Sequence, residues 1–505
     1  MAAVTASGLA GAVFDPWIWT VKWSDTTLSY SFPEDGSAYS YQSTGDVSAL
    51  TASQKAAVRR VLDEIAGFTG LDFVEVSESG RTGGVLRFAN EKYLGGAYAY
   101  LPTNSSHGGD VFFGSGTTAP DLGSEAYLYF LHEIGHAMGL EHGHEFPAFV
   151  ASGLDSQEFT VVTYTDFVGD SATFSYDSGP VDWAHSFQQL DIAALQFLYG
   201  ANYASAGELW SGNTIYTFDP NTGEMSVNGI GQGTPAGNRI FRTIWDGHGE
   251  DTYDLHGYRT DLRIDLNPGA FSTFSEAQLA DLDKFSNSDA RMARGNVANA
   301  RLVDGDLRGL IENARGGAGD DVILGNHVDN LLAGRGGNDA IFGGTGNDAL
   351  KGGSGDDMLR GGPGSDRLVG QGGNDTLFGG DGDDVLVGSA GADVLLGDAG
   401  FDRMRGGGGP DVFRFRSVSD SPVGERADRI VDFTPGVDRL DLRWLSGPEP
   451  ELTLNGRLTG GAAGVATREG NGNTLVLVDV DGDRGVDMRI FLSKTLDLNE
   501  SDFIL

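Results

Sequence analysis

The sequence predicts a multidomain protein in which an α+β domain, built from a twisted mixed sheet and a few helices, is followed by an all-β parallel β-roll. Three observations predict this order. The chain of 505 residues is too long for one hydrophobic core, so two or three domains are expected. Residues up to about Gly200 mix strand-like and helix-like patterns. Residues 316–414 instead repeat a Gly- and Asp-rich nonapeptide.

The first part of the chain contains one clear helix among short strands. TASQKAAVRRVLDEIAGF, from Thr51 to Phe68, opens with the capping-box pair Thr51 and Gln54 and continues with apolar residues at helical spacing. Strands are predicted at 27–32, 71–77, 85–90, 97–102 and 110–114. These elements predict a mixed sheet with helices packed on it.

Two more helices complete this domain. One begins near Ser124, a good N-cap residue, buries an apolar stripe and ends at Gly139. The other is QQLDIAALQFLYG, at 188–200, which closes the domain. Beyond it, we interpret part of WDGHGEDTYDL as a degenerate copy of the later repeat.

Five segments are therefore predicted along the chain. The start, MAAVTASGLAGAVF, has no Lys or Arg before Lys22, so it lacks the basic region of a secretory signal peptide, and we interpret it as a leader or propeptide. The segments are a leader at 1–16, an α+β domain at 17–205, a transition with degenerate repeats at 206–315, the β-roll at 316–414 and a C-terminal cap at 415–505.

Composition excludes several classes of protein. The net charge of −38 argues against nucleic-acid binding, which needs clusters of Lys and Arg. The absence of cysteine excludes disulfides and restricts any zinc site to His and oxygen ligands. The sequence contains no apolar run of about 18 residues, so no transmembrane helix is expected.

The string HEIGHAMGLEH, from His132 to His142, predicts a metal site. His132 and His136 lie one helical turn apart, so both imidazoles can bind one ion. Glu133 lies where it can reach metal-activated water without binding the metal. Gly139 can adopt a left-handed conformation that returns the chain, so that His142 supplies a third ligand.

A structural role is the usual explanation for two histidines on one helix. The full pattern HExxHxxGxxH, however, arises by chance in roughly one in 10⁵ chains of this length, which favours zinc. The other histidines lack ligand spacing, and we predict that they are structural or solvated, with His144 as the one competitor of His142. They are His107, His144, His185, His248, His256 and His327.

HEIGHAMGLEH resembles the zinc motif of the metzincin metallopeptidases, with His132, His136 and His142 at the ligand positions and Glu133 at the position of the general base. FTVVTYTDF, at 159–167, resembles the Met-turn segment of the serralysins, and LDIAALQFLYGAN resembles the helix that closes their catalytic domain. The resemblance implies that Tyr164 is an additional zinc ligand that later binds the developing oxyanion.

The chain departs from the serralysin pattern at two positions. Val162 replaces the methionine of the Met-turn, and Gly143 replaces the proline usual after the third histidine. Valine preserves an apolar floor below the metal, although its shape is less adaptable than that of methionine.

The expected chemistry is hydrolysis of peptide bonds, with zinc as Lewis acid and Glu133 as general base. GGAYAYLP, at 95–102, reads as an edge strand, and an extended polypeptide substrate could pair with it. In the family that the chain resembles, the equivalent segment has this role. The predicted substrate-binding residues are Gly96, Ala97, Tyr98 and Ala99.

Eleven contiguous nonapeptides fill residues 316–414, and they follow the pattern G-G-x-G-x-D-x-U-x of calcium-binding parallel β-rolls, in which U is apolar. Two units are expected to form one coil. Because this segment has sixteen Asp against seven Lys and Arg, the roll should fold only with bound cations. The predicted calcium residues are Gly317, Gly319, Asp321, Asp339, Asp348, Asp357, Asp366, Asp375, Asp384, Asp393, Asp402 and Asp411.

The repeats resemble the repeats-in-toxin (RTX) family, and residues 417–442 resemble the segment that follows the roll in serralysins. The C-terminal SDFIL resembles their uncleaved type I secretion signal. The resemblance implies export through the type I apparatus without a signal peptide, followed by folding outside the cell. Extracellular calcium sites bind at about 10⁻⁴ to 10⁻³ M, which suits this order of events.

The sequence therefore predicts a secreted, extracellular, monomeric zinc metalloendopeptidase that several calcium ions stabilise, with a protein inhibitor as a further expected partner. The alternative is an inactive secreted calcium-binding surface or interaction protein that keeps a protease fold, for which Val162 is the best argument. A secreted lipase with similar repeats would need a G-x-S-x-G pentapeptide, which the sequence lacks.

Overall fold

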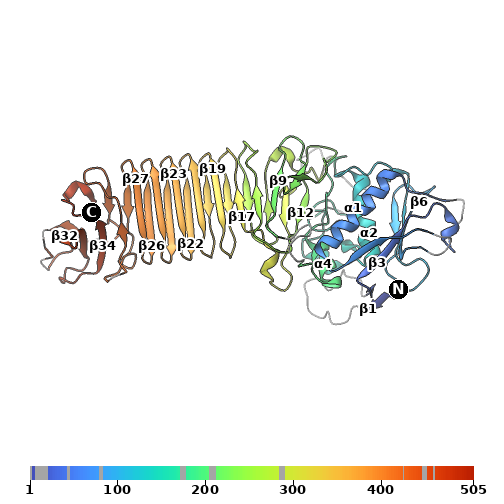
Figure 1. The fold of residues 1–505 in the computed structure, drawn as a ribbon, viewed down its shortest axis with the longest axis horizontal. Coiled ribbons are helices and arrows are strands. Elements are labelled where there is room, and N and C mark those ends of the chain that lie inside the picture. The colour runs from blue at the N-terminus through green and yellow to red at the C-terminus, as the bar shows by residue number, and fades with distance from the viewer. Residues whose placement is uncertain are drawn as a thin grey trace. The chain divides into compact units, whose positions relative to one another are not determined.

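The computed structural model describes residues 3–5, 21–41, 46–78, 83–170, 178–203, 212–283, 291–424, 426–445, 452–455, 457–458 and 461–505. The chain divides into two compact units (Figure 1). Unit 1 consists of Met1–Asp251 and Pro268–Ile311, and unit 2 of Thr252–Asn267 and Glu312–Leu505. The predicted leader at 1–16 lies outside the described residues except for β1 (Ala3–Thr5), which pairs with β2 (Val21–Trp23).

A mixed sheet forms the N-terminal part of unit 1, in the order β5-β3-β6-β8-β7, with β4 paired to β6. Its strands are β3 (Thr27–Ser31), β4 (Val47–Ser48), β5 (Asp72–Glu75), β6 (Leu86–Glu91), β7 (Ala97–Ala99) and β8 (Asp110–Phe113). Strands β3, β5, β6 and β8 are parallel, whereas β4 and β7 run antiparallel to their partners. The five strands predicted from the sequence are thus present, and β7 lies at an edge of the sheet.

The three predicted helices are present as α1 (Ala52–Phe68), α2 (Glu125–Ala137) and α4 (Gln189–Tyr199), and the short α3 (Pro147–Ala151) was not predicted. Helices α1 and α2 contact the sheet, and α4 packs on α1. The predicted capping box of α1 is formed by Thr51 and Gln54. Fully buried residues from α1, α2 and α4, such as Val61, Ile134 and Leu195, belong to one hydrophobic cluster. This core holds α2 in place.

The rest of unit 1 contains two further groups of strands. Strands β9 (Ile215–Phe218), β10 (Met225–Val227) and β11 (Ile230–Gly231) are antiparallel. Strand β16 (Val297–Asn299) pairs with β12 (Arg242–Ile244) and with β15 (Phe271–Ser272).

Unit 2 contains two parallel sheets whose strands alternate along the chain, visible as stacked arrows in Figure 1. The first sheet includes β13 (Thr252–Asp254), β17 (Asn313–Arg315), β19 (Leu331–Gly336), β21 (Ala349–Ser354), β23 (Arg367–Gly372), β25 (Val385–Ala390) and β27 (Arg403–Gly408). The second includes β14 (Arg263–Asp265), β18 (Val322–Leu324), β20 (Ala340–Phe342), β22 (Met358–Pro363), β24 (Thr376–Asp381), β26 (Val394–Ala399) and β28 (Val412–Arg414). Because β13 and β14 belong to these sheets, both sheets extend before residue 316.

The register of these strands agrees with a coil of two nonapeptides. Partners are eighteen residues apart, as in Leu350 with Leu368 in one sheet and Leu359 with Leu377 in the other. The apolar eighth residue of each unit has no exposed surface. This residue therefore fills the narrow interior of the roll, and most of the described fold is β structure in large parallel sheets.

A cap follows the roll. It contains β29 (Arg429–Ile430), β30 (Arg439–Asp441), β31 (Thr453–Leu454), β32 (Gly464–Gly470), β33 (Asn473–Asp479), β34 (Met488–Ser493) and β35 (Phe503–Ile504). Strands β32, β33 and β34 form an antiparallel meander. The C-terminal strand β35 pairs in parallel with β30, so the segment SDFIL is part of the folded cap.

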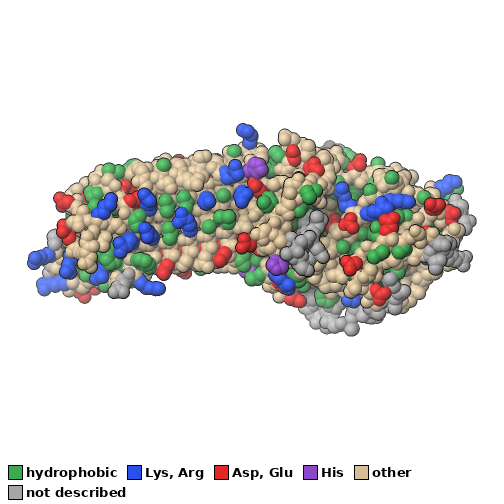
Figure 2. Space-filling model, in the orientation of Figure 1, with side chains coloured by type: hydrophobic (Ala, Val, Ile, Leu, Met, Phe, Trp, Pro, Cys, Tyr) green, Lys and Arg blue, Asp and Glu red, His purple; other side chains and the backbone are tan. Residues whose placement is uncertain are grey.

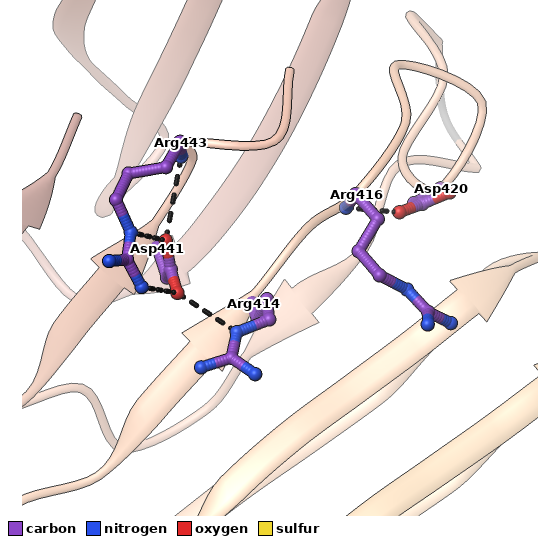
Figure 3. A network of polar contacts seen from close by, with 5 residues as sticks. All are labelled: Arg414, Arg416, Asp420, Asp441 and Arg443. Carbon is purple, nitrogen blue, oxygen red and sulfur yellow. Dashed lines mark hydrogen bonds and ion pairs between the residues drawn. The ribbon is translucent and has the colours of Figure 1, made fainter. Parts of the chain in front are cut away.

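A cluster of charged side chains joins the roll to the cap (Figure 3). The fully buried carboxylate of Asp441 accepts hydrogen bonds from Nε of Arg414 at 2.9 Å and from Nε and Nη2 of Arg443, both at 2.9 Å. Beside it, the backbone amide of Arg416 donates to Asp420 at 2.7 Å. The last strand of the roll, β28, is thus tied to β30 through Asp441.

Figure 2 shows Lys and Arg side chains scattered along the visible face of unit 2 among hydrophobic and neutral ones. Across the described parts of the chain, none of the helices has the length and apolar character of a membrane-spanning helix.

Candidate metal centre

Helix α2 presents the first two histidines of the motif. Ser124 caps its N-terminus by accepting a hydrogen bond from the amide of Tyr127 at 3.2 Å. His132 and His136 then lie one turn apart. Their Nε2 atoms are 3.1 Å from each other.

A glycine turn returns the chain after α2. Gly139 has φ +107°, and the amide of Leu140 donates to the carbonyl of Gly135 at 3.0 Å, as in a Schellman motif. A Cβ at Gly139 would also lie 3.1 Å from the carbonyl oxygen of Val21. This turn brings His142 back toward α2.

The three predicted histidines converge on one point. Nε2 of His142 lies 3.0 Å from Nε2 of His132 and 3.1 Å from Nε2 of His136. Two nitrogen ligands of a tetrahedral zinc ion, each about 2.0–2.1 Å from the metal, are roughly 3.3 Å apart. The donor set and its spacing therefore fit a zinc ion.

The other ring nitrogens have partners that orient the imidazoles. Nδ1 of His132 lies 2.8 Å from the carbonyl oxygen of Val161, and Nδ1 of His136 lies 2.6 Å from that of Leu140. A carbonyl only accepts, so each Nδ1 carries the proton and each Nε2 keeps its lone pair for a metal.

The imidazoles are neutral at physiological pH. Burial, followed by the neighbouring histidines, lowers the pKa of His132 well below its usual value. The same two causes lower the pKa of His136 to about 3. Burial and then His144 lower the pKa of His142 to about 4. The three rings are thus in the form that binds metal.

Glu133, one residue after the first histidine, lies at the junction of α2 and the edge strand β7. Its buried carboxylate accepts a hydrogen bond from the amide of Ala99. Burial raises the pKa of Glu133 to about 8, and this hydrogen bond opposes the rise. A nearby dication would favour the carboxylate further.

Tyr164 lies beside the histidines. Its ring centroid is 4.7 Å from that of His142, 5.6 Å from that of His132 and 4.9 Å from that of His144. Burial raises the pKa of its phenol, and the charge of Glu133 adds to the rise. Binding of the metal by Tyr164 stays a prediction.

Val162, at the Met-turn position, is fully buried beneath α2. A Cβ at Gly135 would lie 3.6 Å from a methyl group of Val162, and the carbonyl of Val162 accepts a hydrogen bond from the amide of Gly143 at 3.2 Å. Valine therefore fills the floor below the histidines.

Asp191, in the first turn of α4, is a supporting residue that the sequence analysis did not single out. Its fully buried carboxylate accepts hydrogen bonds from Thr160 Oγ1 at 2.6 Å, from the amide of Val161 at 2.8 Å and from the amide of Gln188 at 2.9 Å. Val161 is the residue whose carbonyl orients His132. The available signal was a lone acidic residue within an otherwise apolar helix.

Among the described strands β7 pairs only with β8, and its other edge runs beside Glu133. The amide of Tyr100 donates to the carbonyl of Asp110, and the amide of Gly114 donates to the carbonyl of Gly96. The backbone N–H and C=O groups of the even-numbered residues therefore point toward β8. The backbone groups of Ala97 and Ala99 therefore point away from β8. Of the predicted substrate-binding residues Gly96, Ala97, Tyr98 and Ala99, only the two alanines present backbone groups to this edge.

Unit 1 also contains a cavity of about 670 Å³ that is separate from the histidines. Its lining includes the charged residues Arg60, Glu64 and Arg242 and the aromatic residue Trp245, but none of the three histidines of the motif. The metal chemistry therefore does not belong to this cavity.

The aspartates at the sixth position of the repeats form a ladder through unit 2. In each step, the amide of one aspartate donates to Oδ1 of the residue eighteen positions later. Asp339 to Asp357, at 2.8 Å, is one example, and Asp366 to Asp384, at 2.7 Å, is another. The carboxylates are thus held inside the turns of successive coils.

The second oxygen of these carboxylates fits a cation. From Asp339 to Asp411, each Oδ2 is buried and lacks a hydrogen-bond partner among the described residues. A Cβ on the first glycine of the unit would fill the same space, for example 2.1 Å from Oδ2 of Asp366 in the case of Gly361. Burial raises the pKa of Asp375 to about 7 and that of Asp384 to about 8. Buried, unpaired carboxylate oxygens are the ligands that calcium prefers.

The ends of the ladder differ from this pattern. Oδ2 of Asp321, a predicted calcium residue, accepts a hydrogen bond from the amide of Gly317 at 2.7 Å. Beyond the last nonapeptide, Asp428 continues the ladder by accepting from the amide of Asp402 at 2.9 Å, and its Oδ2 is also unpartnered. The sequence analysis missed Asp428, although Asp428-Arg429-Ile430 repeats the D-x-U pattern.

Comparisons with known proteins point to one family. The family model for the C-terminal part of serralysins, Peptidase M10 serralysin C terminal, matches residues 205–273 and 269–505. Serralysin of Proteus mirabilis is 30% identical over 334 residues, which cover 60% of this chain and 60% of that protein. Metalloprotease AprA of Pseudomonas entomophila (strain L48) is 31% identical, covering 61% of this chain and 60% of that one. Serralysin B of Dickeya chrysanthemi is 32% identical, covering 59% and 58%.

The chain thus spans about 60% of the length of the curated relatives that it matches. Among solved structures, the R3 subunit of the Azotobacter vinelandii mannuronan C5-epimerase AlgE6 is 31% identical over 30% of this chain and 80% of that one, with a TM-score of 0.20. The family model alone covers more than half of the chain. The chain therefore belongs to the serralysin-like metallopeptidases of the M10 group.

Proposed function

We propose that this chain is a secreted zinc endopeptidase that folds with calcium. The convergence of three neutral imidazoles beside a buried glutamate and an open strand edge carries this proposal. Residues 17–205 then form a metzincin catalytic domain, 206–315 lead into the roll, 316–414 bind calcium and 415–505 contain the cap and the export signal.

The residues around the histidines have distinct roles in peptide hydrolysis. His132, His136 and His142 would hold the zinc ion, which would supply a Lewis acid for the scissile carbonyl and for the attacking water. Glu133 accepts the proton of the attacking water and delivers it to the leaving amine. The phenol of Tyr164, kept protonated by its raised pKa, donates a hydrogen bond to the oxyanion.

The substrate is an extended polypeptide that adds a strand to β7. Ala97 offers its amide and carbonyl and Ala99 its carbonyl, whereas the amide of Ala99 is bound to Glu133. Strand pairing of this kind binds the backbone of any sequence and aligns a peptide bond with Glu133.

Calcium would be held by the aspartates of the ladder, and it would neutralise carboxylates that repel one another without it. We propose that calcium outside the cell triggers folding after type I export, and that the active protein is an extracellular monomer open to a protein inhibitor. The buried Val162 gives no support to the alternative of an inactive chain, because it leaves the floor of the site filled.

Substitution Glu133→Gln tests the catalytic proposal. It keeps the shape of the side chain but removes the base, so we expect casein cleavage to fall by about 10²- to 10⁴-fold. Mass spectrometry of the native protein should still detect bound zinc. Glu125→Gln, an isosteric change at an exposed position of α2, is the matched control and should cleave normally. Full cleavage by Glu133→Gln, or zinc-loaded wild type without cleavage, contradicts the proposal.

A further inference from the structure

A second group of metal-binding side chains lies on the far edge of the His142 ring. It consists of His142, His144 and Glu145, and we call it the 142–145 cluster. One ligand atom from each of the three residues lies within 4.8 Å of the others. We propose that the 142–145 cluster binds a second transition-metal ion.

The local backbone gathers these side chains. Residues 143–145 form a single turn of 3₁₀ helix directly after His142. Nδ1 of His142 lies 3.5 Å from Oε1 of Glu145, and the ring centroids of His142 and His144 are 4.9 Å apart. The His142–Glu145 separation is close to the roughly 3.3 Å between two ligands of a tetrahedral ion.

His144 supplies an independent indication. Its Nδ1 is buried and has no hydrogen-bond partner among the described residues. A buried polar nitrogen without a partner carries a desolvation cost, which a bound cation would remove. The Glu145 side chain is 60% exposed, so an ion from solvent can reach the cluster and the carboxylate can turn to meet it.

The donor set selects the metal. Two imidazole nitrogens with one carboxylate suit Zn²⁺, Cu²⁺ or Ni²⁺, whereas Ca²⁺ and Mg²⁺ prefer oxygen ligands. The 142–145 cluster therefore differs in specificity from the aspartate ladder, and saturating calcium should not fill it.

The two centres share one ring. Nε2 of His142 faces His132 and His136, while its Nδ1 faces Glu145. Because the same ring would contact both ions, a second cation there would lie close to the first, so we expect the second ion to inhibit cleavage. This effect rests on the proposed function, but the binding does not.

Binding stoichiometry tests the proposal directly. The untagged full chain is saturated with calcium, stripped of zinc, and dialysed against increasing free Zn²⁺ before its metal content is measured. We expect two zinc ions per wild-type chain, the second weaker than the first. His144→Ala and Glu145→Gln should weaken the second ion by at least roughly tenfold and leave the first unchanged. Glu141→Gln, which changes a neighbouring carboxylate outside the cluster, should bind two.

A spectroscopic and a kinetic readout separate this proposal from the catalytic one. With one zinc bound, added Cu²⁺ should give an electron paramagnetic resonance signal with nitrogen hyperfine structure in the wild type but not in His144→Ala. Excess zinc should inhibit the wild type and spare His144→Ala. A single ion in the wild type, or two tight ions in both variants, overturns the second site. Two ions without any proteolysis overturn only the catalytic proposal.

Discussion

The Nδ1 atom of each histidine on α2 is hydrogen-bonded to a main-chain carbonyl. The residue that supplies one of these carbonyls, Val161, is itself bound by Asp191. The path runs from the carboxylate of Asp191 through the amide of Val161 to the carbonyl that orients His132. Such outer contacts determine the direction of a ligand's lone pair. The buried carboxylate of Asp191 therefore acts as a positioning residue for the His132 ring.

Substitution Asp191→Ala should weaken zinc binding by about 10- to 100-fold, because the amides of Val161 and Gln188 lose their acceptor. Asp191→Asn should rescue most of this loss, since its carbonyl can still accept from both amides while Thr160 reverses its hydroxyl. Zinc affinity is measured by competition with a chelator. Equal losses in the two variants would contradict the positioning role.

A residue of the metal centre could be predicted when it lies close in the sequence to the residues that it contacts. The three histidines, Glu133 and Gly139 fall within one helix and its turn, so local geometry predicted how they could meet. Asp191 and Val161 are thirty residues apart and meet only through the packing of α4. The 142–145 cluster was also overlooked, because His144 was weighed only as a substitute for His142.

At the scale of the coil, the first glycine of each nonapeptide makes room for the carboxylate of its own unit. Gly361 tests this requirement. In Gly361→Ala the new methyl group would lie 2.1 Å from Oδ2 of Asp366, so we expect a loss of about 1–3 kcal/mol in stability and of calcium from that turn. Calcium titration followed by thermal unfolding measures both.

Gly372→Ala is the matched control for Gly361→Ala. The nearest atom to a Cβ at Gly372 is 3.8 Å away, and neither glycine has a positive φ. The control should change stability by less than about 0.5 kcal/mol. If the two substitutions have similar effects, the position of Gly361 does not need glycine to leave room for the carboxylate of Asp366.

The calcium-free roll should become less stable as pH rises. Burial raises the pKa of Asp339 and Asp348 to about 7, above the value of about 3.9 in an unfolded chain. A raised carboxyl pKa gives stability that is complete below about pH 4 and is lost as the pH rises toward 7. Hydrogen exchange in residues 316–414, corrected for intrinsic rates, should be slower at pH 5 than at pH 7.5. Calcium should remove the difference.

The repeat made the strand register of the roll predictable, whereas the register of the predicted cap was not. A strict nine-residue period determines which residues face the interior and which neighbours pair, so both sheets followed from the sequence. The meander of β32, β33 and β34 has no repeat, and its register depends on contacts that only the folded cap provides. The short strands of unit 1 were found, but their ends shifted by a few residues, since β7 covers only Ala97–Ala99 of the predicted 97–102.

For unit 2 as a whole, Asp441 joins the roll to the cap. Although burial raises the pKa of Asp441, hydrogen bonds from Arg443 and Arg414 outweigh it and lower the pKa below its usual value. The stability that this carboxylate contributes is present above about pH 4 and is lost as the pH falls through the lowered value. Asp441→Asn should therefore destabilise unit 2 at pH 7, by about 1–3 kcal/mol, more than at pH 3. Thermal unfolding in calcium at both pH values measures the effect, and equal destabilisation would contradict it.

The hydrogen bonds of the aspartate ladder all run in one direction along unit 2. The amide of each sixth-position aspartate depends on a carboxylate from the following coil, and for Asp402 and Asp411 the cap supplies that acceptor through Asp428 and Asp438. A coil without its successor lacks these acceptors, whereas the coil beside the cap is complete as soon as the cap has formed. Folding of unit 2 should therefore begin at the cap and proceed coil by coil toward the N-terminal end of the roll.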